Sequence, residues 1–310
     1  MEVAKRNIHI LYNRHLRPLI RKMSLTSTIG NAVWPEEDLA LPKDSKILIT
    51  GANGYIASHI VKEALDLGFA VKGTVRDQAK GDKLKAALNS ESLEIVVVED
   101  LAAPGAFDKA VEGCDAVVHA ATVTTLSPDP EYIKDVVDGA TGILRSAVKA
   151  GTVKRFVYTS SSTACTLPIL NTKFTIDKST WNQSSIDKVK EFKPPHDPSQ
   201  AFDVYGASKT LAEKAIWDFV KDEKPSFVVN SIIPNANLGA DPPLQPGSTG
   251  TWPDGILLGN FPYFDMVPPQ WYVHVADDAK LHLAALIDKT VENDRVFGKS
   301  TPSKQGRQVC

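Results

Sequence analysis

A buried strand that runs directly into a glycine-containing turn is the feature that most constrains the fold of this chain. The apolar run KILIT (46–50) is followed by GANGYIA (51–57) and then by a helix-like segment. Glycines at such a turn let the backbone reverse tightly and approach a pyrophosphate without an intervening Cβ. The next helix offers unpaired N–H groups to the phosphates. This pattern predicts a dinucleotide-binding turn, although a similar turn in another nucleotide or methyl-donor fold is an alternative. The residues we assign to the cofactor here are Gly51, Asn53, Gly54, Tyr55 and Ile56.

Short apolar runs and helix-like segments alternate from residue 46 onward. The runs lie at 47–50, 71–75, 95–98, 116–119, 156–160 and 227–233, and the helix-like segments at 58–67, 82–88, 106–112, 132–150 and 205–221. Strands that alternate with helices predict a parallel sheet of right-handed βαβ units. Such strands are buried on both faces, which explains uninterrupted apolar runs such as IVVV (95–98). We therefore expect an α/β fold with a doubly wound parallel sheet.

The composition argues against several classes of protein. The 310 residues are 43% hydrophobic and 23% charged, as in an ordinary globular chain. A net charge of −2 argues against a nucleic-acid-binding surface, and no apolar run approaches the roughly 18 residues of a membrane span. The three cysteines lack the spacing of a disulfide framework or metal site. We expect no metal, nucleic-acid or membrane partner, a reducing compartment, and a monomer or homodimer.

Both ends of the chain differ from its middle. Residues 1–22 carry six basic side chains and, apart from Glu2, no acid. This pattern fits a mitochondrial presequence, but we favour a disordered extension, or a start placed upstream of Met23, in a cytoplasmic protein. Residues 234–253 hold five prolines and three glycines and predict a loop-rich substrate lobe. We expect an extension over 1–44, poorly ordered over 1–22, followed by a dinucleotide-binding domain over 45–233. A substrate lobe would follow over 234–297, and the atypical tail over 298–310 resembles a truncated end.

The end of the second predicted strand indicates which dinucleotide is bound. Val75 stands where an acid would bind the free ribose 2′-hydroxyl of NAD(H), and Arg76 follows it. A guanidinium suits a 2′-phosphate because it binds phosphate through a planar, bidentate fork. Lys80 and Lys83 would add charge, and we assign Lys83 to the cofactor with Arg76. The alternative is an Arg76 that is solvated and paired with Asp77. We favour NADP(H).

A tyrosine and a lysine separated by four residues suggest proton chemistry. Tyr205 and Lys209 would project from one face of a helix. A phenol beside a cation and an oxidised nicotinamide has a pKa lowered from about 10, which suits a proton donor to a carbonyl. Alone, the pair also fits an ordinary amphipathic helix. The predicted strand that ends in the hydroxyl side chains TSSS (159–162) favours the catalytic interpretation. His119, at the end of another apolar run, is more typical of a hydrogen-bonded core histidine than of a catalytic base. The chain contains neither H-E-x-x-H nor G-x-S-x-G.

Together these motifs resemble the extended short-chain dehydrogenase/reductase family, within it the branch of dihydroflavonol reductases, cinnamoyl-CoA reductases and fungal aldehyde/methylglyoxal reductases. The matching segments are TGANGYIA, GTVRD, Asp100-Leu101, VVHAAT, RFVYTSSSTA, DKSTWN, YGASK and SIIPNANLG, between about Met23 and about Phe297. The resemblance implies a Rossmann fold with a small C-terminal substrate lobe. It also implies hydride transfer from NADPH to the carbonyl of a small aldehyde or ketone.

Residue roles follow from the same resemblance. Tyr205 would be the acid, Lys209 would hold the nicotinamide ribose, and Ser161, with Ser160 as the alternative, would polarise the carbonyl. The remaining cofactor assignments are Asp100 and Leu101 at the adenine, Ala120, Ala121 and Thr122 at the ribose and pyrophosphate, and Pro234 at the nicotinamide. Two rival functions stay open. One is a nucleotide-sugar epimerase or dehydratase of the same fold, and the other is a truncated, non-catalytic dinucleotide-binding protein.

Two further features bear on the substrate. The branch often has an acid in its D-E-x-x-W pattern where this chain has Lys178, which puts the finer substrate preference in doubt. Aromatic side chains after residue 180 suggest an apolar or aromatic carbonyl compound, although packing of a loop-rich lobe explains them equally well. These aromatic residues are Trp181, Trp252, Phe261, Tyr263, Phe264 and Trp271.

Overall fold

The computed structural model describes residues 39–122, 126–239, 247–259, 267 and 269–298 of the chain. The predictions about residues 1–22 and about the tail beyond Gly298 lie outside the described residues, as do the aromatic residues Phe261, Tyr263 and Phe264.

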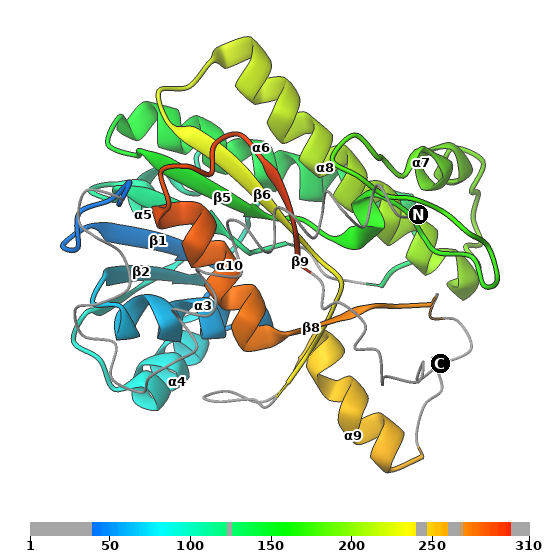
Figure 1. Cartoon of the computed structure of the whole chain (residues 1–310), viewed down its shortest axis with the longest axis horizontal. Helices are drawn as coiled ribbons and strands as arrows, with labels where there is room; N and C mark the ends of the chain where they lie inside the picture. The colour runs from blue at the N-terminus through cyan, green and yellow to red at the C-terminus, as the bar shows by residue number, and fades with distance from the viewer. Residues whose placement is uncertain (1–38, 123–125, 240–246, 260–266, 268, 299–310) are drawn as a thin grey trace.

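Seven parallel strands form the central sheet, in the order β3-β2-β1-β4-β5-β6-β9 (Figure 1). Their bounds are β1 Lys46–Thr50, β2 Ala70–Val75, β3 Leu93–Val97, β4 Ala116–His119, β5 Arg155–Thr159, β6 Val228–Pro234 and β9 Arg295–Gly298. The chain runs outward from β1 to β3 and then returns to place β4 on the other side of β1. This reversal opens a crevice at the carboxyl ends of β1 and β4, where α/β proteins bind ligands. The predicted doubly wound sheet is confirmed.

Helices cover both faces of this sheet. Ile47 and Ile49 of β1 point into one core with α3 (Tyr55–Asp66) and α10 (Val275–Ile287). Leu48, between them, points into the opposite core. This second core contains side chains of α5, α6 and α8, whose bounds are Asp108–Val111, Ile133–Ala150 and Ala201–Glu223. Two further helices before residue 233 are α4, Gln78–Leu88, and α7, Gln183–Val189, and α7 packs against α8.

Beyond residue 234, a small unit lies past the carboxyl ends of the main strands. Strands β7 (Ala236–Leu238) and β8 (Tyr272–His274) pair in parallel, and α9 (Trp252–Leu257) lies between them in the chain. The chain then returns to the main body, where α10 packs against α3 and β9 pairs with β6 (Figure 1). The division at residue 233 stays a prediction. None of the described helices combines the length and apolar character that crossing a bilayer requires.

Candidate active site

The turn after β1 is shaped for close approach by a ligand. Gly51 has φ +64°, and a Cβ there would lie 3.0 Å from Cα of Ala121. Its N–H donates to the Thr74 hydroxyl at 3.1 Å, and the Ala121 N–H donates to the Thr50 hydroxyl at 3.0 Å. These bonds hold the turn against the ends of β2 and β4. Gly54, which caps α3, has no side chain to bond the helix N–H groups, so they are available to an anion.

A cleft of about 350 Å³ extends from this turn to the ends of β5 and α8. Most of the residues assigned to the cofactor line it. They are Gly51, Asn53, Gly54, Tyr55, Ile56, Arg76, Leu101, Ala120, Ala121, Thr122, Tyr205 and Lys209. Lys83, Asp100, Pro234 and Ser161 are not part of this lining. The cradle made by the turn, with two cations near one end and the Tyr–Lys pair at the other, fits a phosphorylated dinucleotide.

The cations at one end of the cleft are Arg76 and Lys80. Asp77 forms its ion pair with Lys80, at 2.8 Å, and accepts from the Lys80 N–H at 3.0 Å as the N-cap of α4. Among the described residues no ion pair of Arg76 is found, so the alternative that joined Arg76 to Asp77 is not what the structure shows. Lys80 takes the place in the cleft wall that we had assigned to Lys83.

Tyr205 and Lys209, one turn apart on α8, line the other end of the cleft. The Tyr205 side chain is hydrogen-bonded to Ser161, which follows β5. Ser161 also accepts hydrogen bonds from the N–H of Thr163 at 3.2 Å and from its hydroxyl at 2.9 Å. The structure thus brings together the three predicted catalytic side chains, with Ser161 behind the cleft wall.

Burial dominates the pKa values of this pair. Burial raises the pKa of Tyr205 above its ordinary value, and the hydrogen bond from Ser161 acts in the opposite direction. Lys209 instead donates to the Tyr158 hydroxyl at 3.0 Å and to the Thr159 carbonyl at 2.8 Å. Burial lowers the pKa of Lys209 to about 8. Lys209 is not among the groups that shift the Tyr205 pKa, because its ammonium is bonded elsewhere, and the lowering expected beside an oxidised nicotinamide stays a prediction.

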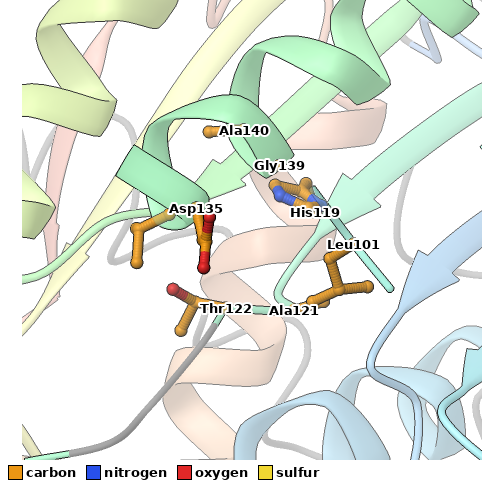
Figure 2. Close-up of a pocket in the computed structure, with 8 residues that line it drawn as sticks. Leu101, His119, Ala121, Thr122, Asp135, Gly139 and Ala140 are labelled. Carbon is orange, nitrogen blue, oxygen red and sulfur yellow. The ribbon is translucent and has the colours of Figure 1, made fainter. Parts of the chain in front are cut away.

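A smaller pocket of about 10 Å³, the size of a single water, lies next to the cleft (Figure 2). It shares Leu101, Ala121 and Thr122 with the cleft, and Figure 2 shows the Asp135 carboxylate and the Thr122 hydroxyl facing the same space. His119 closes another side and lies 2.9 Å from the Thr50 hydroxyl through Nδ1. Burial lowers the pKa of His119 to about 3, so the ring is neutral, as expected for a core histidine.

Lys178 does not line the cleft. Its ammonium pairs with Asp294 at 2.5 Å, and its carbonyl accepts from Arg295 at 2.7 Å, so it belongs to the edge of the sheet near β9. Trp181 lies against the same guanidinium, 3.7 Å from ring centre to Cζ. Trp271 packs against Phe174 with ring centres 6.2 Å apart. These contacts support lobe packing as the role of the two tryptophans.

Several lining residues were not assigned from the sequence. They are Ala57, Thr74, Val98, Thr159, Ser248 and Thr249. Val75, Lys80 and Ser160, considered from the sequence without a firm assignment, line the cleft as well. Ser248 and Thr249 come from the segment after residue 246 and reach the cleft because the Thr249 hydroxyl donates to the Asn237 carbonyl at 2.6 Å. The neighbouring Tyr55 hydroxyl donates to the Gly239 carbonyl at 3.1 Å. No local motif signals these long-range contacts.

Comparison with known proteins finds matches along most of the chain. The model of the NAD dependent epimerase/dehydratase family matches residues 47–296. Aldehyde reductase 2 of Sporidiobolus salmonicolor is 38% identical over 270 residues, which cover 84% of this chain and 78% of that protein. A ketoreductase of Penicillium roqueforti is 34% identical over 279 residues, 87% of this chain and 80% of the other. The solved structure of yeast methylglyoxal/isovaleraldehyde reductase complexed with NADPH superposes with a TM-score of 0.68 at 27% identity, covering 82% of this chain and 78% of that chain.

Proposed function

The chain belongs to the NAD dependent epimerase/dehydratase family, and from this premise we propose that it transfers hydride from NADPH to the carbonyl of an aldehyde or ketone. It is an NAD(P)-dependent oxidoreductase of the extended short-chain dehydrogenase/reductase type, and its cofactor is NADP(H). The observation that carries the proposal is the shared cleft, which has Arg76 near one end and Tyr205 with Lys209 at the other.

We propose which residues of the cleft bind each part of NADPH. The N–H groups of the Gly51–Ile56 turn and of the α3 N-terminus would hold the pyrophosphate. Arg76, with Lys80 beside it, would bind the 2′-phosphate, and Lys209 would bind the nicotinamide ribose. Roles for Asp100 at the adenine and Pro234 at the nicotinamide rest on the family resemblance. NADPH supplies the hydride, and the chain supplies position and a proton.

Tyr205 is the proposed proton donor. As the carbonyl carbon receives hydride, its oxygen gains negative charge, and the Tyr205 phenol gives that oxygen a proton to yield the alcohol and NADP⁺. The raised pKa keeps the phenol protonated before the reaction. The hydroxyl of Ser161, next to Tyr205, would stabilise the same oxygen, and the phenolate would regain its proton from solvent afterwards.

The test is NADPH oxidation by the purified full chain with a panel of aliphatic and aromatic aldehydes and ketones. We expect turnover with at least one member, and for Tyr205→Phe a fall in kcat of roughly 100-fold or more with the Kd for NADPH within about twofold. Tyr272→Phe, an exposed tyrosine of β8, is the matched control. Failure of the whole panel would contradict the proposal, and a nucleotide released only on denaturation would favour an epimerase instead.

A further inference from the structure

A fully buried carboxylate lies below the catalytic end of the cleft. Glu213 follows Lys209 by one turn of α8 and has no exposed surface. The Arg295 guanidinium of β9 binds both of its oxygens, Nε at 2.9 Å from Oε1 and the terminal nitrogen at 3.2 Å from Oε2. Both oxygens of Glu213 therefore act as hydrogen-bond acceptors.

Two serine hydroxyls donate to this carboxylate. Ser160 donates to Oε2 at 2.6 Å and Ser231 donates to Oε1 at 2.7 Å. The distances are those of charge-assisted O–H···O⁻ bonds, which fix the direction of each hydroxyl proton. The two serines differ in one respect: Ser160 lines the cleft, whereas Ser231 lies within β6 and does not.

The direction of its proton limits what Ser160 offers to a ligand. A hydroxyl has one donor and two acceptor lone pairs, and the donor of Ser160 is committed to Glu213. Toward the cleft, Ser160 therefore presents only an acceptor. It has no proton left for the carbonyl oxygen of a substrate, which argues against Ser160 as the residue that polarises the carbonyl.

We propose that Ser160 is a cofactor-binding residue whose polarity is set by Glu213, and that its oxygen accepts a hydrogen bond from a donor on the nicotinamide half of NADPH. The proposal rests on the proposed function. The nicotinamide half follows from position, because the preceding residue, Thr159, binds the Lys209 ammonium through its carbonyl at 2.8 Å. The donors in that half of the molecule are the ribose hydroxyls and the carboxamide N–H group.

The experiment compares Ser160→Ala with Ser231→Ala in the full chain. Each substitution removes one donor from Glu213, so both share any cost to folding, which thermal unfolding without nucleotide will report. We expect the calorimetric Kd for NADPH to rise about three- to tenfold in Ser160→Ala, as for loss of one hydrogen bond, and to stay within about twofold in Ser231→Ala. Ser160→Cys, which keeps the shape of the side chain but replaces the oxygen with a larger, weak sulfur acceptor, should weaken binding similarly and serves if Ser160→Ala does not fold.

The 3-acetylpyridine analogue of NADPH, which lacks the amide N–H, identifies the donor. A Ser160→Ala effect that disappears with the analogue assigns the carboxamide, and one that persists assigns a ribose hydroxyl; either supports the proposal. An unchanged Kd for NADPH in Ser160→Ala overturns it, including the case in which only kcat falls, which would make Ser160 a donor to substrate. Wild-type protein that binds NADPH but reduces no carbonyl would refute the proposed function and leave the Kd comparison readable.

Discussion

Lys209 is a buried ammonium that donates to two acceptors. Its nitrogen uses the Tyr158 hydroxyl and the Thr159 carbonyl, and it lies 4.7 Å from the centre of the Tyr158 ring. Burial lowers its pKa to about 8, while Glu213 partly opposes that shift. The charge state of the group that is to hold the nicotinamide ribose therefore changes close to neutral pH.

Activity should consequently fall as the solution becomes alkaline. Below pH 8 Lys209 is protonated and able to donate to the ribose, and above pH 8 it is neutral. We expect kcat/KM to be level from about pH 6 to 7.5 and to decline above a midpoint near 8, measured with saturating NADPH and one good substrate. The residual activity of Lys209→Arg should lack this decline, because guanidinium keeps its proton throughout. A wild-type profile level up to pH 10 would contradict the assignment.

We propose that Arg76, which lines the cleft, sets the preference for a phosphorylated cofactor. Arg76→Gln removes a charge-assisted bond to the 2′-phosphate, so we expect the Kd for NADPH to rise roughly 10- to 100-fold while that for NADH changes less than about threefold. Lys83→Gln, a loss of the same charge outside the cleft wall, is the matched control and should change either Kd little. Equal losses for both cofactors in Arg76→Gln would show that Arg76 acts on folding or on the pyrophosphate.

At the scale of elements, α10 carries an unusual buried acid. Asp278 is completely buried, and burial raises its pKa to about 8. One turn later His282, also buried, lies 2.8 Å from the Asp278 carbonyl through Nδ1 and 2.8 Å from the Thr159 hydroxyl through Nε2, and its pKa is lowered to about 4. The helix therefore holds a neutral acid and a neutral histidine near neutral pH.

Stability should depend on pH through Asp278. The folded state keeps this proton up to about pH 8, whereas the unfolded chain releases it near pH 4, so its contribution is lost as pH rises toward 8. His282 opposes this only below its ordinary pKa of about 6.5, where rising pH favours the folded state. Between pH 6.5 and 8 we expect wild-type protein to lose about 2 kcal/mol of unfolding free energy relative to Asp278→Asn.

Urea denaturation of both proteins at pH 6.5 and pH 8 measures this difference. Asp277→Asn, on the exposed side of the same turn, should follow the wild-type trend. Parallel changes in wild type and Asp278→Asn over this interval would mean that Asp278 is ionised in the folded protein.

The elements that were predicted are those whose signals are local. Strands β1 and β5 are short, uninterrupted apolar runs because both of their faces are buried, and Tyr205 and Lys209 meet because of helical spacing alone. Strand β9 was not predicted, because a short run that begins with Arg295 does not have the pattern of a buried strand. The guanidinium is satisfied by the carbonyls of Lys178 and Thr180 and by Glu213, which lies 82 residues away in sequence. The same long-range bond decides the polarity of Ser160, which the sequence left open.

At the scale of the whole molecule, one side chain joins the first half of the chain to the end of α10. Arg155, at the start of β5, is buried and donates to the carbonyls of Leu286 at 3.0 Å and Asp288 at 2.9 Å, and also to those of Ala285 and Val291. Asn230 of β6 donates to the Ala285 and Val291 carbonyls as well, both at 2.9 Å. Without Arg155, the carbonyls of Leu286 and Asp288 would lose this buried donor.

Arg155→Met should therefore lower the free energy of unfolding by about 3 kcal/mol or more, because it keeps the buried volume but leaves carbonyls unsatisfied at the end of a helix. Arg145→Met, an exposed arginine of α6, should stay within about 0.5 kcal/mol of wild type. Urea unfolding at 25 °C measures the free energy of unfolding of both variants, and the m-value should be unchanged. Since the contacts lie away from the cleft, the folded Arg155→Met protein should bind NADPH with wild-type Kd. A loss below about 1 kcal/mol would mean that Asn230 and solvent satisfy these carbonyls without Arg155, and that α10 is held by its packing against α3.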